Sequence, residues 1–221
     1  MVGPRFAGHA KHVRCSKETG GSPVNLRDGV IRRLLVLYGT YALVNNLAYL
    51  LGYYLLHIGL LRGGPAVSVV ESADSFGGTL ALTLLFNLGL VALVGVGVNL
   101  FRVKGVSVGY LYPVFMGTMA GLVTGTDSFA AADAMQMPLR EGMAAGLSIG
   151  GAEMLGYICV IAATMKFGVY EYPSWFRGKA LKTGRIRDVR LDRSEISTLA
   201  LGVVLLVVGA VLETQDAWRA L

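Results

Sequence analysis

The feature that most constrains this chain is a set of long apolar segments. Four of them exceed the ~18 residues with which an α-helix crosses a ~30 Å hydrocarbon core. Three of the four carry no charged residue and the fourth contains only Glu153: Leu34–Leu61, Ser75–Phe101, Gly105–Thr126 and Gly142–Thr164. Ile196–Leu212 forms a fifth apolar segment, at the lower limit of length. A helix satisfies its own backbone hydrogen bonds without water, so the pattern predicts an all-α, polytopic membrane protein with about five transmembrane helices.

The composition favours the same class. Only 15% of the residues are charged and 54% are hydrophobic, which is typical of membrane proteins rather than soluble domains. We expect a basic tail over 1–33, a helical bundle over 34–213 that includes a basic loop at 169–195, and a short tail over 214–221. The polar start and the length of the first apolar segment do not fit a cleaved signal peptide, so that segment is expected to be the first span.

The distribution of basic residues predicts an orientation. Sixteen of the 20 lysines and arginines lie in 1–33, 102–104 and 177–193, whereas the intervening loops and the end carry only Arg62, Arg140 and Arg219. The remaining one, Lys166, follows the fourth apolar segment. Because an excess of Lys and Arg marks the cytoplasmic side, we expect a cell-membrane protein with a cytoplasmic N-terminus and an external C-terminus.

The basic segments have two interpretations. Retention on the inner side by anionic lipid headgroups explains them without any protein partner. A cytoplasmic protein that contacts the loop at 177–193 is the alternative. Nucleic acid is not expected as a partner, because no aromatic–basic interleaving or nucleic-acid motif is present.

Glycines recur at intervals of four in two of the apolar segments. The third segment has Gly105, Gly109, Gly117, Gly121 and Gly125, and the fourth has Gly142, Gly146 and Gly150. Such rows lie along one face of a helix and let two helix backbones approach closely. The pattern predicts close helix packing and a homo-oligomer or another membrane protein as partner.

Pro113 occupies the missing step in the first glycine row. Inside a helix, proline removes a backbone donor and clashes with the preceding turn, so a kink or break is expected near Leu111. Such a break is either structural or a hinge beside a transport pathway.

Glu153 is the most informative polar residue. On one continuous helix it would lie close to the direction of Gly142 and Gly146 and point into the bundle. A carboxylate at that depth is expected to be protonated or paired. The candidate partners in other segments are Asn45, Asn46, His57, Asn87 and Asn99. The residue is either a proton or ion site or an interhelical hydrogen-bond anchor, and the sequence leaves both open.

Catalytic signatures are missing from the sequence. No Ser–His–Asp set, HExxH motif, nucleotide-binding glycine loop or metal-binding cysteine pair is present. We expect a protein that is not an enzyme and that has no cofactor and no metal site.

Three stretches resemble the stage II sporulation protein M family of bacterial and archaeal membrane proteins. "LLFNLGLVALVGVGVNLF" places Asn87 at an asparagine of that family. "GLSIGGAEMLGYICVIAATMKFG" matches a Pro-His-Gly-x-x-Glu motif at Gly150 and Glu153, and "LALGVVLLVVGAVLET" ends in the corresponding Glu213. The chain departs from the family at Ser148 and Ile149, where Pro and His are usual, and at Met116, where many members have Asn.

The resemblance implies a role in assembly rather than catalysis. The sporulation member is a membrane component of a complex that directs cell-wall hydrolysis during engulfment, and it acts as a partner of the hydrolase. Our leading hypothesis is therefore a non-enzymatic membrane subunit or scaffold. The alternative is a small transporter or channel in which Glu153 couples transport to a proton or ion.

Overall fold

The computed structural model describes residues 29–62, 75–128, 138–148, 151–175 and 178–219. The expected basic tail up to residue 28 and Gly150 therefore lie outside the described residues. Within them the chain is mostly helical, and three helical segments are long and apolar enough to cross a membrane: Val30–Leu55, Phe76–Val98 and Arg193–Gln215. The length and composition of these three segments agree with a membrane location.

Two of the three candidate spans are long regular helices. α1 covers Val30–Leu55 and α8 covers Arg193–Arg219. The third is helical throughout but changes its winding, from α3 (Phe76–Leu84) through a π-helix, η1 (Leu85–Ala92), to α4 (Leu93–Val98). Ser75 begins this segment by accepting a hydrogen bond from the Gly78 backbone N–H, as an N-cap serine does.

The third predicted span starts later than expected. Residues 106–107 form a strand, η2 (Val108–Leu111) is a 3₁₀ turn, and α5 occupies only Tyr112–Gly125. Pro113 lies in the first turn of α5, where its missing N–H has no helical acceptor in any case. The single helix expected over 105–126 is therefore wrong, but a break near Leu111 is present as expected, because η2 ends at Leu111 and α5 begins at Tyr112.

The fourth predicted span is two helices instead of one. α6 covers Leu139–Ser148 and α7 covers Gly151–Thr164, followed by a 3₁₀ turn, η3 (Met165–Phe167). The sequence around the change, "SIGG", consists of weak helix formers. The expected common face of Gly142 and Glu153 is consequently wrong, since the two residues belong to different helices.

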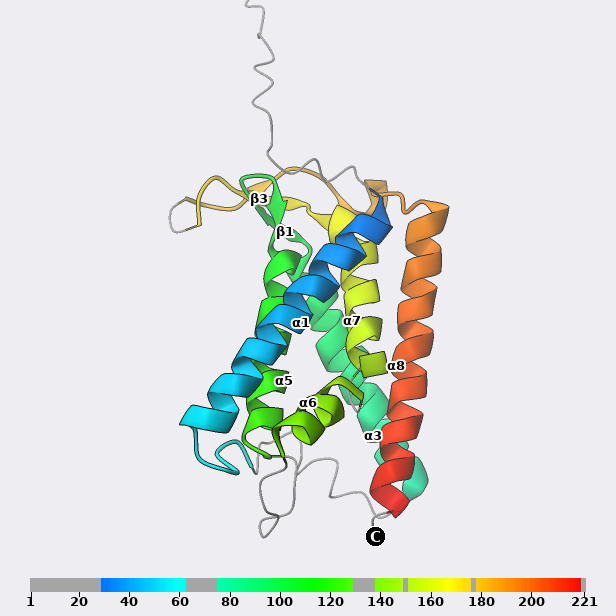
Figure 1. Cartoon of the computed structure of the whole chain (residues 1–221). Helices are drawn as coiled ribbons and strands as arrows, with labels where there is room; N and C mark the ends of the chain where they lie inside the picture. The colour runs from blue at the N-terminus through cyan, green and yellow to red at the C-terminus, as the bar shows by residue number, and fades with distance from the viewer. Residues whose placement is uncertain (1–28, 63–74, 129–137, 149–150, 176–177, 220–221) are drawn as a thin grey trace, which may run out of the picture.

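The five-span count is not reproduced by helix length. α5 and α7 have 14 residues each, which corresponds to about 21 Å at 1.5 Å per residue. Both are shorter than the hydrocarbon core of a bilayer. Both lie among the longer helices, because α5 packs along α1 and α7 packs along α8 (Figure 1).

A small sheet corrects the all-α expectation. Its strands, β1 (Phe101–Val103), β2 (Val106–Ser107), β3 (Tyr170–Tyr172) and β4 (Leu181–Lys182), have the order β2-β1-β3-β4. β1 is antiparallel to β2 and parallel to β3, and β4 is antiparallel to β3. Lys104 and Gly105 join β1 to β2 with positive φ at both residues, as a type I′ hairpin turn requires. Gly105 thus belongs to a turn and not to a glycine row.

Glycines lie where two helix pairs come closest. A Cβ at Gly117, Gly121 or Gly125 of α5 would overlap the backbone carbonyl oxygens of α1. In the second pair, a Cβ at Gly156 of α7 would lie 3.0 Å from the Gly202 carbonyl oxygen of α8. Gly142 is buried at the start of α6, where a Cβ would meet the Tyr49 hydroxyl. Gly146 lies on α6 as well.

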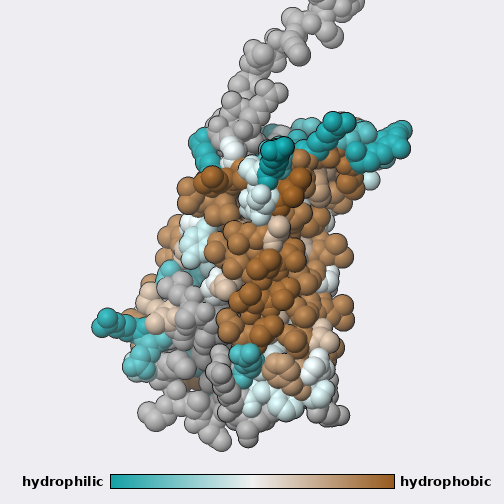
Figure 2. All heavy atoms as spheres, turned by 90° about the vertical axis from the view of Figure 1, so that its right-hand side faces the viewer, coloured by the Kyte–Doolittle hydropathy of each residue, from teal (hydrophilic) through white to brown (hydrophobic). Residues whose placement is uncertain are grey.

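The two ends of the bundle differ in charge. The first turns of α1 and α8 and the whole sheet lie at one end, which we call the basic end, whereas α6 and the last turns of α8 lie at the other (Figure 1). Seen from the side of α8, an apolar band covers the middle of the molecule (Figure 2). The described lysines and arginines of the segments predicted to be cytoplasmic therefore share one end.

Candidate functional site

Glu153 lies in the first turn of α7, and this helix starts about half-way along the bundle (Figure 1). Its position near a helix N-terminus favours a negative charge, because the backbone N–H groups point toward that end. On the α8 side its Cβ adjoins Gly209, where an added Cβ would come within 3.3 Å. Glu213 follows one turn later on α8 and is exposed.

Two neutral donors contact Glu153, and together the three residues form the Glu153 cluster. Asn87, which is 4% exposed, donates a hydrogen bond from Nδ2 to Oε1 of Glu153. Tyr157 donates to the same oxygen from its hydroxyl at 3.2 Å. Asn87 lies on the π-helix η1, a type of winding that is rare and often occurs at functional sites.

The other asparagines singled out from the sequence lie elsewhere. Asn45 is buried on α1, and its Oδ1 has no hydrogen-bond partner among the described residues. Asn46 donates to the Ala42 carbonyl oxygen one turn earlier in the same helix. Asn99 is fully buried near the basic end. Of the candidate partners, the structure thus brings Asn87 to Glu153.

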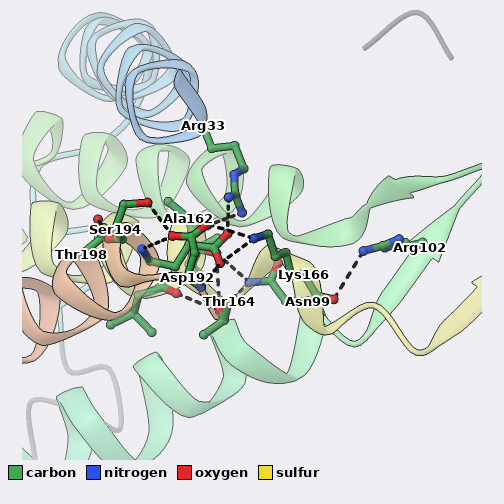
Figure 3. Close-up of polar contacts among 12 residues, drawn as sticks. Arg33, Asn99, Arg102, Ala162, Thr164, Lys166, Asp192, Ser194 and Thr198 are labelled. Carbon is green, nitrogen blue, oxygen red and sulfur yellow. Dashed lines mark hydrogen bonds and ion pairs between the residues drawn. The ribbon is translucent and has the colours of Figure 1, made fainter. Parts of the chain in front are cut away.

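A second polar cluster surrounds Glu195 at the basic end, where Arg33, Lys166 and Asp192 converge (Figure 3). Glu195 is 0% exposed, and its Oε1 lies 2.5 Å from Nη2 of Arg33. Its Oε2 lies 2.8 Å from Nζ of Lys166. Arg33 also donates from Nη1 to the Ala162 carbonyl oxygen at 2.9 Å. We call these four residues the Glu195 cluster; it joins α1, the end of α7 and the start of α8.

Asp192 and Glu195 form a capping box at the start of α8. The Glu195 N–H donates to Oδ1 of Asp192 at 2.9 Å, and the Asp192 N–H donates to Oε2 of Glu195 at 3.0 Å. The two side chains satisfy backbone donors that the helix itself leaves unpaired. Glu195 therefore serves both as the cap and as the partner of two cations.

The charges of the cluster shift the pKa values of its exposed members. The hydroxyl of Ser194, the Glu195 N–H and Lys166 all favour the ionised form of Asp192 and hold its pKa well below the usual range. The hydrogen bond to Glu195 raises the pKa of Lys166. Both groups are thus stabilised in their charged forms at neutral pH.

Asn99 extends the polar contacts beside this cluster. Its Nδ2 donates to the Ile161 carbonyl oxygen at 2.9 Å and to the Thr164 hydroxyl at 2.8 Å. Its Oδ1 accepts from the Ser107 hydroxyl at 2.9 Å. Asn99 therefore fastens the last turn of α7 to the hairpin that precedes α5, which is a structural role.

Sequence reasoning missed the Glu195 cluster. Arg33 was counted only as a charge of the basic tail, and Glu195 was not singled out. One signal was present: Asp-x-x-Glu directly before an apolar run is a capping pattern. The ion pair with Arg33 has no comparable signal, since the two residues lie 162 positions apart.

Within the described ranges, no group of three or more His, Cys, Asp or Glu side chains is placed to hold a metal ion. No protein-family model, curated protein or solved structure matches the chain.

Proposed function

We propose that this protein is a non-enzymatic integral membrane subunit of the stage II sporulation protein M type, which serves as a scaffold in a larger membrane complex. The Glu195 cluster is the observation that carries the proposal. It holds the ends of three helices in one arrangement through contacts of 2.5–2.9 Å that converge on or beside the fully buried Glu195. A scaffold needs a surface of fixed geometry for its partners, and the cluster fixes one end of the bundle. The described residues include no arrangement typical of a catalytic site.

The proposal includes five passes. α5 and α7 would be the two shorter ones: α7 is buried from Gly156 to Thr164, and α5 packs along α1 while Phe115 and Met119 would face lipid. The N-terminus would be cytoplasmic and the C-terminus external, because the basic end carries the start of α1 and the start of α8 (Figure 1).

Two rows of exposed aliphatic side chains are the proposed contact surfaces within the membrane. Leu43, Leu47 and Leu51 on α1 are 53–63% exposed, and Val204, Val208 and Leu212 on α8 are 44–57% exposed. Each row advances by four residues and so follows one helix face. A second copy of the chain or another membrane protein would pack there, and glycine-faced pairs such as α1 and α5 would keep the bundle itself compact.

Native mass spectrometry after extraction in a mild detergent tests the scaffold. We expect a complex of defined stoichiometry, either of several copies or with another membrane protein. Replacing Leu43 and Leu47 by alanine is expected to weaken it, and the same change at Leu60 and Leu61, outside α1, serves as the control. A monomer at all protein concentrations would refute the proposal.

A proton- or ion-coupled transporter is the second candidate, and a specific observation favours it. Glu153 lies in the first turn of a helix that starts in the middle of the bundle, and its partner Asn87 lies on a π-helix, so a helix start and a change of helix winding meet at one carboxylate. Helices that start inside the membrane form part of the binding sites of many transporters.

Proton flux into liposomes separates the two functions. A transporter should carry flux above that of protein-free liposomes and lose it in Glu153→Gln, while Glu141→Gln, at an exposed position on α6, keeps it. A scaffold should show no such flux, and its complex should survive Glu153→Gln.

A further inference from the structure

An extended segment leaves β3 at the basic end and returns to the start of α8. We call its described residues, Trp175 and 178–190, the basic arm. Five basic residues of this arm are exposed, namely Lys179, Lys182, Arg185, Arg187 and Arg190. Its only acidic residue, Asp188, lies 3.8 Å from Arg187. The arm therefore presents a strong positive charge.

Apolar side chains are interleaved with these charges. Trp175 is 49% exposed, Leu181 62% and Ile186 50%. If the arm faced only water, the exposure of three large apolar side chains would be unfavourable. Tryptophan and basic residues together are instead typical of the layer where a bilayer meets water.

The arm lies in the plane that such a layer would occupy. It extends sideways from the helices at the level of the first turns of α1 and α8 (Figure 1). Pairing of β4 with β3 holds it, together with a hydrogen bond of 2.9 Å from the Thr183 N–H to the Val169 carbonyl oxygen. Its direction is thus set by the sheet, across the axes of the helices.

We propose that the basic arm lies on the membrane surface and binds anionic phospholipid headgroups. The inference rests on the membrane location in the proposed function. The lysines and arginines would contact lipid phosphates, while Trp175, Leu181 and Ile186 enter the headgroup region. The mixture of charge with exposed apolar side chains favours a lipid surface over an acidic protein, for which the charges alone would suffice.

Fluorescence of Trp175 tests the contact. The chain has two tryptophans, so Trp218→Phe leaves Trp175 as the reporter. The protein is placed in nanodiscs of phosphatidylcholine with or without phosphatidylglycerol, and quenching by lipids brominated near the headgroup is measured. We expect stronger quenching with the anionic lipid, and loss of most of that gain when the five basic residues are replaced by glutamine. Salt should have the same effect, because the Debye length falls from about 10 Å at 0.1 M to about 3 Å at 1 M.

Trp218, near the opposite end of the bundle, provides the control. In Trp175→Phe its quenching should not depend on phosphatidylglycerol. If the glutamine variant does not fold, the salt titration of the Trp218→Phe protein decides the question. Trp175 that stays unquenched in a protein firmly embedded in the nanodisc would overturn the inference and favour an acidic protein partner. A protein that alkaline carbonate extracts from membranes would instead refute the proposed function.

Discussion

Glu153 and Glu195 occupy equivalent places, the first turn of an apolar helix, yet their surroundings differ. Glu195 is fully buried and faces Arg33 and Lys166, so its charge is neutralised inside the protein. Glu153 is partly exposed, and the hydrogen bonds described for it come from neutral groups, Asn87 and Tyr157. The first environment pairs the carboxylate with two cations and stabilises one permanent arrangement, whereas the hydrogen-bond donors described at the second carry no charge. The second is therefore the carboxylate at which the proposed alternative function, exchange of a proton or a cation, would take place.

The largest effect is expected for Glu195→Ala. The change leaves the Arg33 guanidinium buried without its carboxylate and removes half of the capping box. Breaking a buried pair in this way costs about 3–5 kcal/mol of unfolding free energy. Thermal unfolding in detergent, followed by tryptophan fluorescence, measures the loss.

Glu141→Ala is the matched control, because Glu141 is also in the first turn of a helix but is exposed. Its unfolding temperature should stay near that of the wild type. The double change Arg33→Met and Glu195→Leu should cost less than Glu195→Ala alone, because no unpaired charge remains. If Glu195→Ala and Glu141→Ala unfold at the same temperature, the buried ion pair of Glu195 does not stabilise the protein more than an exposed carboxylate does.

Asn87→Leu is expected to have the next largest effect. It removes the donor from η1 and leaves the Glu153 oxygen with the Tyr157 hydroxyl. The loss of one hydrogen bond to this partly exposed carboxyl group costs about 1–2 kcal/mol. Asn46→Leu is the control and should cost less, because the described hydrogen bond of Asn46 lies within α1. If the two variants unfold at the same temperature, the contact between Asn87 and Glu153 does not stabilise the bundle.

Glu153→Gln should be milder still. Glutamine keeps an acceptor oxygen for Asn87 and Tyr157, so the change in stability should stay within about 1 kcal/mol. Thermal unfolding at neutral pH checks this beside Glu195→Gln, which removes the charge opposite Arg33 and should cost more. Destabilisation by Glu153→Gln as large as that by Glu195→Gln would mean that both carboxylates are structural.

The sequence predicted those helices whose formation depends on the composition of one continuous segment. The long apolar runs at α1, α3 to α4 and α8 predicted helices, because length and apolarity are properties of a segment. The break between α6 and α7 and the strands around Arg102 and Glu171 were missed. Short elements of two to fourteen residues are set by packing against distant parts of the chain, and an apolar pattern does not reveal them.

The two carboxylates show the same limit at the level of side chains. Glu153 was conspicuous because a single charge in an apolar run has few explanations, and Asn87 was one of five candidate partners. Glu195 was inconspicuous because it follows a basic loop, where charges are common. Its burial depends on Arg33 and Lys166, which only the fold brings to it.

The smallest effect concerns the exposed side of the Glu195 cluster and acid. The pKa of Asp192 is lowered in the folded protein, so its contribution is complete above its unfolded pKa of about 3.9 and is lost as the pH falls through the lower folded value. For Lys166 the pKa is raised, so its contribution is complete below its unfolded pKa of about 10.4 and is lost as the pH rises through the folded value.

Unfolding temperatures measured from acid to neutral pH should therefore fall below about pH 4, and less steeply in Asp192→Asn than in the wild type. Asparagine still caps the helix at neutral pH, so a difference confined to acid isolates the charge, whereas Asp188→Asn, paired only with Arg187 at the surface, should follow the wild-type curve. Parallel curves for Asp192→Asn and wild type would show that the charge of Asp192 adds nothing to the cluster, and that Glu195, Arg33 and Lys166 alone hold the basic end.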